Sequence, residues 1–260
     1  MKKEKEEKRK RIFLRIAYDG TNYVGWQIQK NGLAVEEVIN QKLSDLTGEK
    51  IIVIGASRTD SGVHAMGNVA VFDTMSSIPP TRFSYALNQR LPEDIRIQES
   101  FQVADDFHPR YTKSISKTYE YKVLNCSFER PTERFYTHYV YFPMNLEKMR
   151  EAAQYIIGEH DFKSFCSMHS QVQTTVRTIY DLEIQKENDI ITFSIRGNGF
   201  LYNMVRIIVG TLLKVGGGAY PPEHVKEIIE ACDRSKAGPK VPAKGLTLLE
   251  IAYGDIQKVE

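Results

Sequence analysis

A polar loop between two apolar segments carries the side chains of this 260-residue chain that are best suited to chemistry. Residues 55–65 read Gly-Ala-Ser-Arg-Thr-Asp-Ser-Gly-Val-His-Ala, so Arg58 and Asp60 stand between two glycines. A carboxylate in such a loop can act as a nucleophile or stabilise a developing cation. The structural alternative is an Asx turn at Asp60 beside a solvated Arg58, and composition alone favours that alternative.

A second candidate is an arginine at the centre of a strongly apolar segment, residues 201–215. A helix that is apolar on nearly every side is buried, and a buried arginine almost always has an anionic partner. Asn203 lies one turn before Arg206 and Gly210 lies one turn after it, which gives a narrow polar stripe. Three partners stay open for Arg206: a structural carboxylate, a substrate phosphate or a catalytic carboxylate.

Tyr119 is a third candidate, on a predicted strand over residues 114–124. Tyr121 and Val123 share its face, because side chains alternate along a strand. Aromatic side chains on an RNA-binding sheet stack on bases, but pattern alone favours an ordinary core position for Tyr119.

Other site signatures are missing from the sequence. The six histidines and three cysteines show no spacing typical of metal ligands, and no Gly-x-x-x-x-Gly-Lys-Ser/Thr phosphate loop or Gly-x-Ser-x-Gly elbow is present. We therefore expect no metal. The apolar run at residues 200–215 is too short and too charged for a membrane span, and the N-terminus does not resemble a secretory signal, so we expect a cytoplasmic protein without a membrane segment.

Charge is concentrated at the N-terminus. The whole chain has a formal net charge of +2, and its first eleven residues hold seven Lys/Arg and three Glu, so the rest carries −2. A nucleic-acid ligand would need a local basic patch rather than bulk charge. We expect residues 1–11 to form a disordered charged tail.

Short strands alternate with single helices along the rest of the chain, which predicts an α+β fold. We expect two similar halves, residues 12–106 and 107–260, that share a mostly antiparallel central sheet with helices packed on it. Strands are predicted at residues 12–18, 51–54, 68–72, 95–103, 114–124, 178–185, 190–196 and 247–253, and helices at about 35–46, 80–87, 146–157, 201–215 and 223–231.

Seven segments in order, from about residue 12 to 254, resemble the TruA family of tRNA pseudouridine synthases. The Arg-Thr-Asp-x-Gly-Val-His-Ala block at residues 58–65 is the most specific of them. The others are residues 18–27, 107–110, 117–121, 158–162, 198–206 and 245–248.

The resemblance implies a role for each candidate. Asp60 matches the catalytic aspartate and Arg206 the arginine that pairs with it. Tyr119 matches the tyrosine that stacks on the target base, Arg58 the arginine that helps displace the target nucleotide, and Leu246 an apolar residue of the base pocket. It also implies the pseudouridine synthase fold, uridines at tRNA positions 38, 39 and 40 as substrates, a homodimer and no cofactor.

Five positions depart from the common family pattern without removing a catalytic group. They are Ser57, Ser61, Lys117, Asn203 and Ile207.

Pseudouridine formation breaks the N1–C1′ bond, turns the uracil and rejoins it through C5. Asp60 can attack C1′ or C6 of the base, or stabilise a cation as the base departs. Two other classes stay open: a hydrolase that uses Asp60, which usually needs a second carboxylate or a metal, and a non-catalytic RNA-binding module, which needs no Arg206–Asp60 pair.

Overall fold

The computed structural model describes residues 9–112, 115–167, 173–254, 256 and 258–259. The chain divides into two compact units, one formed by Met1–Ile115 with Glu250–Glu260 and the other by Ser116–Leu249. Most of the expected charged tail, residues 1–8, lies outside the described residues.

The first unit extends past the expected boundary at residue 106 and also includes the C-terminal residues. Tyr253 donates its hydroxyl proton to the carbonyl of Pro109 at 2.8 Å. Lys258 forms an isolated antiparallel bridge with Val103, and its ammonium group donates to Glu99 at 2.9 Å. These bonds explain why the last residues group with the N-terminal strands.

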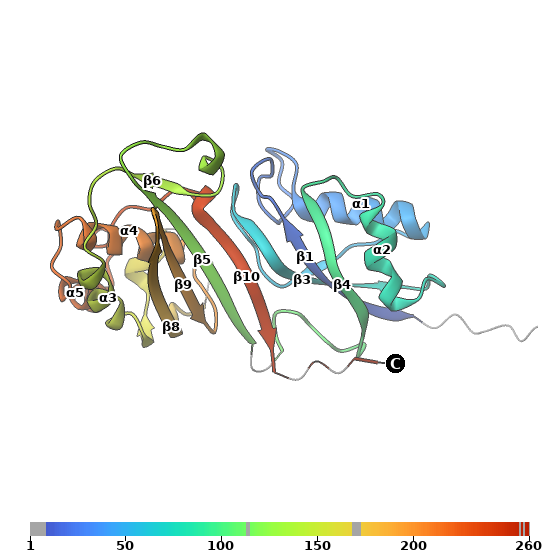
Figure 1. The fold of residues 1–260 in the computed structure, drawn as a ribbon. Helices are drawn as coiled ribbons and strands as arrows, with labels where there is room; N and C mark the ends of the chain where they lie inside the picture. Colours follow the sequence, from blue (N-terminus) through green and yellow to red (C-terminus); the bar gives the residue numbers. More distant parts are fainter. Residues whose placement is uncertain (1–8, 113–114, 168–172, 255, 257, 260) are drawn as a thin grey trace, which may run out of the picture. The chain divides into compact units, whose positions relative to one another are not determined.

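The first unit is a small antiparallel sheet with two α-helices (Figure 1). The central strand β1 pairs with β3 on one edge and β4 on the other, while β2 adds to β3. Helix α2 packs on β4, and α1 packs beside α2. The elements are β1 (Lys10–Tyr18), α1 (Val35–Thr47), β2 (Ile54–Gly55), β3 (His64–Thr74), a 3-10 turn (Pro80–Arg82), α2 (Phe83–Asn88) and β4 (Ile95–Val103).

The expected strand over residues 51–54 is wrong for most of its length, because only Ile54 belongs to β2. Side chains of α1 take the backbone donors that a ladder would use. Ser44 Oγ accepts the N–H of Ile51 at 3.0 Å, and Asn40 Oδ1 accepts that of Val53 at 2.8 Å. Residues 51 and 53 are still buried, so the apolar pattern reported burial rather than a strand.

The second unit has helices α3, α4 and α5 gathered beside a longer run of strands (Figure 1). Strands β5, β9, β8 and β7 pair antiparallel in that order, β6 pairs parallel with the end of β5, and β10 borders β5. The elements are β5 (Ile115–Asn125), a 3-10 turn (Pro131–Glu133), β6 (His138–Val140), α3 (Leu146–Gln154), β7 (Gly158–Asp161), a 3-10 turn (Lys163–Phe165), β8 (Val176–Glu187), β9 (Ile190–Gly197), α4 (Met204–Gly216), α5 (His224–Ala231), a 3-10 turn (Ala243–Gly245) and β10 (Leu246–Tyr253).

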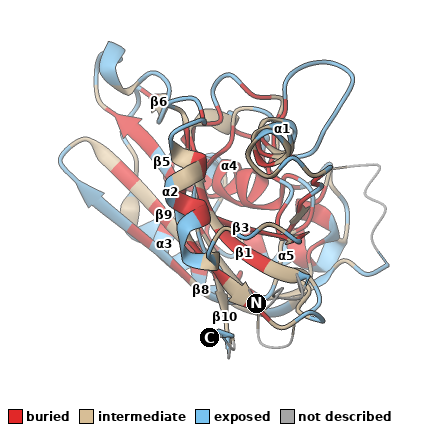
Figure 2. Ribbon diagram, turned by 90° about the vertical axis from the view of Figure 1, so that its right-hand side faces the viewer, coloured by how far each residue is buried: buried red, intermediate tan, exposed pale blue. Residues whose placement is uncertain are grey.

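Helix α4 lies at the core of the second unit. Every residue from Met204 to Gly216 is buried except Lys214, and Figure 2 shows the helix as buried along its length. The helix begins three residues later than expected, because Asn203 adopts a left-handed conformation with φ of 62°. The nearly all-round apolar pattern correctly predicted a buried helix.

The α+β class is confirmed, with strands that pair mostly antiparallel and five α-helices among the described residues. The sequence missed the short strands β6 and β7, since neither is long enough to show an alternating pattern. Within the described part of the chain, no helix is long and apolar enough to cross a membrane.

Candidate active site

The loop that carries Asp60 connects β2 to β3 in the first unit. The backbone of Asp60 forms an isolated antiparallel bridge with Gly25, and its carbonyl accepts the N–H of Val63 at 3.1 Å. This second bond closes a turn whose third residue, Gly62, has φ of 75°, a value that favours glycine. The loop therefore has a defined backbone, and Asp60 sits at the first position of its turn.

Residues 20–26, which follow β1, hold the Asp60 loop through backbone hydrogen bonds. The N–H of Trp26 donates to Thr59 O at 3.1 Å, and that of Gly62 donates to Tyr23 O at 3.3 Å. Gly25 has φ of 108°, and a Cβ there would lie 2.5 Å from Thr59 O. Glycine at position 25 thus permits the close approach of two backbones beside Asp60.

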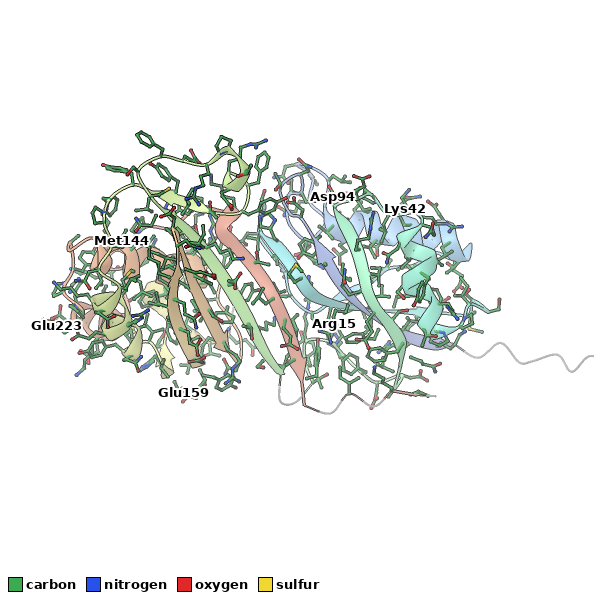
Figure 3. All side chains as sticks on the ribbon, viewed as in Figure 1. Arg15, Lys42, Asp94, Met144, Glu159 and Glu223 are labelled. Atoms are coloured by element: carbon green, nitrogen blue, oxygen red, sulfur yellow. The ribbon has the colours of Figure 1, made fainter. Side chains whose placement is uncertain are left out.

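The side chain of Tyr23 anchors the same segment away from the loop. Its hydroxyl donates to Oδ1 of Asp94 at 2.6 Å, and Figure 3 labels Asp94, which immediately precedes β4. Burial, followed by this hydrogen bond, raises the pKa of Tyr23. The tyrosine hydroxyl therefore stays a proton donor, and it fixes the segment that supports the Asp60 loop.

A buried polar network fixes the first half of the loop. The hydroxyls of Tyr18 and Thr59 lie 2.7 Å apart. The amide of Asn68 donates to Tyr18 Oη and to the carbonyl of Ser57, both at 3.2 Å. Our sequence analysis missed the supporting roles of Tyr18 and Asn68. The available signal was a polar Asn at the start of an apolar strand, since a buried amide needs partners.

His64 is a further buried residue that our sequence analysis assigned no role. It begins β3, is 5% exposed, and accepts the backbone N–H of Gly20 at Nδ1 with a distance of 3.1 Å. The same nitrogen lies 3.1 Å from Oδ1 of Asp19. The histidine thereby ties the turn after β1 to the strand that follows the Asp60 loop.

The two charged residues of the loop differ in their exposure to solvent. Arg58 is exposed and Asp60 is half-buried. An exposed Arg58 agrees both with a solvated side chain and with a residue that reaches into a bound nucleic acid.

Arg206 lies in the second unit, buried in α4 with 9% of its surface exposed. Its Nε donates to the carbonyl of Val241 at 2.8 Å, and Nη1 donates to Oδ1 of Asn203 at 2.9 Å. Asn203 in turn donates to Ser167 Oγ at 2.9 Å. The polar stripe of Asn203 and Arg206 expected from the sequence is confirmed, and two neutral acceptors orient the guanidinium.

The carbonyls at residues 241 and 242 link Arg206 to strand β5. Tyr121 donates its hydroxyl proton to Pro242 O at 2.8 Å. Burial raises the pKa of Tyr121, while the nearby charge of Arg206 opposes that rise. The second unit thus brings Arg206, Tyr121 and the segment before β10 together.

Tyr119 and Leu246 belong to the same unit. Tyr119 on β5 is 7% exposed, and its ring meets the edge of Phe200 with centroids 5.1 Å apart. Leu246 is the first residue of β10 and is 6% exposed. At the preceding Gly245, a Cβ would lie 2.7 Å from the ring of Tyr121, so the start of β10 packs tightly on β5.

The five predicted site residues therefore divide between the units. The first unit places Asp60 and Arg58 on one loop, and the second places Tyr119, Arg206 and Leu246 around β5 and α4. The pairing of Asp60 with Arg206 stays a prediction. Within the described ranges, no group of three or more His, Cys, Asp or Glu side chains is placed to hold a metal ion.

A family model described as tRNA pseudouridine synthase matches residues 15–112 and 152–254. Both matched stretches contain predicted site residues, namely Arg58 and Asp60 in the first and Arg206 and Leu246 in the second. Tyr119 lies between the two stretches.

Curated relatives match over nearly their full length. The protein "tRNA pseudouridine synthase A" of Acetivibrio thermocellus is 50% identical over 242 residues, which cover 93% of this chain and 99% of the relative. The protein of the same name from Thermoanaerobacter sp. (strain X514) is 48% identical with the same coverage. A solved Cbf5-Nop10-Gar1 complex aligns over 78% of this chain and 45% of the matched chain, with a TM-score of 0.34 and 12% identity, too low to support an argument. On the family match and these relatives, the chain belongs to the tRNA pseudouridine synthase family.

Proposed function

We propose that this chain isomerises uridine to pseudouridine in the anticodon stem-loop of tRNA, at positions 38, 39 and 40. The observation that carries the proposal is Asp60, presented half-buried by a loop with a fixed backbone in a chain of this family. The names of the relatives support tRNA as the substrate.

The reaction is an internal rearrangement. The N1–C1′ bond breaks, a C5–C1′ bond forms, the proton on C5 leaves, and N1 gains a proton. Asp60 acts by one of three routes. Its carboxylate can attack C1′ as the N1–C1′ bond breaks, and the resulting C1′–O bond breaks when C5 displaces the carboxylate. It can instead add to C6 and leave again after C5 has bonded to C1′, or it can stabilise the cation at C1′ without forming a bond. The product is an isomer of the substrate, so the net reaction consumes no oxidant or reductant, and we propose that no cofactor takes part.

Arg206 serves Asp60 by pairing with its carboxylate. A guanidinium offers donors in a planar fork, and Nε and Nη1 of Arg206 already donate to Val241 and Asn203. This orientation supports a role in which the remaining donors hold a carboxylate in its ionised form.

The target base must leave the stack before it reacts, which costs a few kcal/mol. Tyr119 offsets part of that cost by stacking on the extruded uracil, and Arg58 helps displace the nucleotide. Leu246 supplies an apolar wall that retains the detached base. The burial of Tyr119 and Leu246 supports an enclosed base site.

The remaining features of the proposal follow the family. We propose a cytoplasmic enzyme that acts as a homodimer without a metal. Sedimentation of the active enzyme tests the dimer: activity in a monomer at assay concentration would contradict it.

Tritium release from tRNA labelled at C5 of uridine tests the reaction. Pseudouridine formation releases this tritium, whereas glycosidic hydrolysis and simple binding do not. Mapping pseudouridines before and after treatment tests the three positions. Binding without release would favour an RNA-binding module, and free uracil would favour a hydrolase.

A further inference from the structure

Arg110 is held next to the Asp60 loop by a bond that leaves most of its guanidinium available. Its Nε donates to the carbonyl of Gly55 at 2.6 Å, and Gly55 is the last residue of β2 before the loop. Among the described residues, neither Nη1 nor Nη2 of Arg110 has a hydrogen-bond or carboxylate partner. The guanidinium is therefore held in place through Nε, and its two terminal nitrogens have no protein acceptor among the described residues.

The charges around Arg110 make this position unfavourable without an anion. The side chain is half-buried, and burial is the largest cause that lowers its pKa. The second cause is the positive charge of Arg58, while Tyr111 and Glu36 act in the opposite direction. No carboxylate of the described residues lies within ion-pair distance of Arg58 or Arg110. Arg110 is thus partly dehydrated near the charge of the exposed Arg58, and neither arginine has a carboxylate partner among the described residues.

The segment that carries Arg110 is ordered by its own contacts. The backbone N–H of Arg110 donates to Nδ1 of His108 at 3.1 Å, and the hydroxyl of Thr112 donates to the carbonyl of His108 at 2.6 Å. The ring of Tyr111 stacks on His108 with centroids 4.5 Å apart, yet Tyr111 is 81% exposed. A supported aromatic face therefore lies beside Arg110.

We propose that Arg110 and Arg58 bind a backbone phosphate of the RNA beside the target nucleotide. This inference rests on the proposed function. Two guanidinium groups suit the geometry and charge of a phosphate. The exposed Tyr111 favours a nucleic acid over a free anion, because basic side chains interleaved with exposed aromatics are typical of surfaces that bind single-stranded nucleic acid.

The position of Arg110 gives the phosphate contact a function beyond affinity. Arg110 donates to the carbonyl of Gly55, where the loop begins, so a phosphate bound by Arg110 is linked through this bond to the backbone that presents Asp60. Phosphate contacts set the register of a protein on a nucleic acid. The contact thereby positions the target nucleotide of the anticodon stem-loop at Asp60.

Binding of an anticodon stem-loop RNA to Arg110→Gln, measured over a series of salt concentrations, tests the proposal. Loss of a charge-assisted contact, worth about 1.5–3 kcal/mol, should raise Kd by at least about tenfold. The slope of log K against log salt should flatten by about 0.7–0.9. Arg90→Gln is the matched control: Arg90 is an exposed arginine of the same unit, and among the described residues its guanidinium donates to the carbonyl of Ala86, at 3.2 Å, and has no carboxylate partner. It should change Kd by less than about twofold.

Replacing one phosphate of the RNA at a time by a neutral methylphosphonate locates the contact. It also distinguishes loss of the contact from a general distortion of the loop in the variant. The wild-type protein should lose affinity when one linkage next to the target is neutral, and Arg110→Gln should be insensitive to that substitution. Arg90→Gln should keep the wild-type pattern. An Arg110→Gln protein that keeps the wild-type pattern would overturn the proposal, even if its overall affinity fell.

The same experiment separates this inference from the proposed function. Wild-type protein that binds the stem-loop with the expected pattern but releases no tritium would support the phosphate site and contradict the enzymatic proposal. Pseudouridine formation by Arg110→Gln with an unchanged Kd and register would support the enzymatic proposal and overturn the phosphate site. Failure of the wild-type protein to bind the RNA would overturn the phosphate site.

Discussion

Asp60 and Arg206 are placed in their units by different means. Asp60 lies on a half-exposed loop whose shape comes from backbone bonds to residues 20–26 and from glycines at close approaches. Arg206 lies inside a buried helix, where regular backbone bonds hold the chain and neutral acceptors orient the side chain. The position of Asp60 therefore depends on the segments that bond to its loop. The position of Arg206 depends on the acceptors that its buried guanidinium can reach.

The consequence is a different balance between activity and stability. A change of the Asp60 side chain should remove chemistry at a smaller cost in stability than a change of Arg206, because Asp60 is only half-buried and Arg206 keeps its bonds to Val241 and Asn203. A change of Arg206 should affect both, because a buried cation and its acceptors must be satisfied together.

The largest expected effect is on activity, in Asp60→Asn. A neutral amide is a poor nucleophile, so the rate of pseudouridine formation should fall by at least about 10³-fold, while phosphate contacts keep tRNA affinity near wild type. Asp45→Asn on α1 is the control and should keep full activity, because the Asp45 carboxylate accepts a hydrogen bond from Gln41 at 2.9 Å on the same helix, away from the loop. Turnover in a clean Asp60→Asn preparation would contradict the nucleophile assignment.

Arg206→Leu tests whether the buried arginine of α4 pairs with Asp60. If Arg206 pairs with Asp60, breaking the pair should cost about 3–5 kcal/mol in urea unfolding. Loss of the cation favours the protonated carboxyl, so the acid limb of the activity profile should move to higher pH. Arg206→Lys should rescue poorly because it lacks the planar fork.

A double-mutant cycle decides whether the two residues are coupled. Asp60→Ala combined with Arg206→Leu should recover part of the stability that Arg206→Leu alone loses. Simple additivity in urea or thermal unfolding would show that Arg206 serves a phosphate or another carboxylate.

Gly25→Ala tests how far the loop depends on its support. A positive φ costs a non-glycine residue about 1–3 kcal/mol, and the new Cβ would press on Thr59 O. We expect a loss of about 2–4 kcal/mol, with a lower kcat in the fraction that folds. Gly48→Ala, with φ of 74° and nothing within 4 Å of its Cβ, should cost only about 1 kcal/mol and leave kcat unchanged. Equal effects of the two changes on kcat would contradict the role of Gly25.

The smallest expected loss of stability comes from breaking the ion pair between Arg11 on β1 and Asp73 on β3. Arg11 binds Asp73 through Nε and Nη2, both at 2.9 Å, and the hydrogen bond from Arg11 is the largest cause that lowers the pKa of Asp73. The folded pKa lies below the ordinary value of 3.8, so the pair stabilises the fold above that pH and loses its contribution as pH falls further.

Asp73→Asn should therefore cost about 1 kcal/mol in urea unfolding at neutral pH, since both side chains are partly exposed. The difference from wild type should shrink below pH ~4 as the wild-type carboxyl takes up a proton. A difference that stays constant with pH would mean that the hydrogen-bond geometry, rather than the charge, stabilises the pairing of β1 with β3 at this point.

Elements with long, regular residue patterns could be predicted from the amino-acid sequence. The boundaries of β4 match the expected strand, and α1 ends at Gly48 as predicted. The apolar segment around Arg206 correctly predicted a buried arginine beside Asn203. These predictions succeeded because burial and helix termination leave a periodic signal in the residues themselves.

The support of the Asp60 loop could not be predicted without the folded structure. Tyr18 and Gly25 lie far from Asp60 in sequence, and their bonds to the loop, like those of Asn68, follow no local pattern. Arg110 joins Gly55 across 55 positions, so its guanidinium became a candidate phosphate site only once the fold was known. Periodicity records which residues are buried, but the partner of a polar group depends on which distant segments the fold brings together.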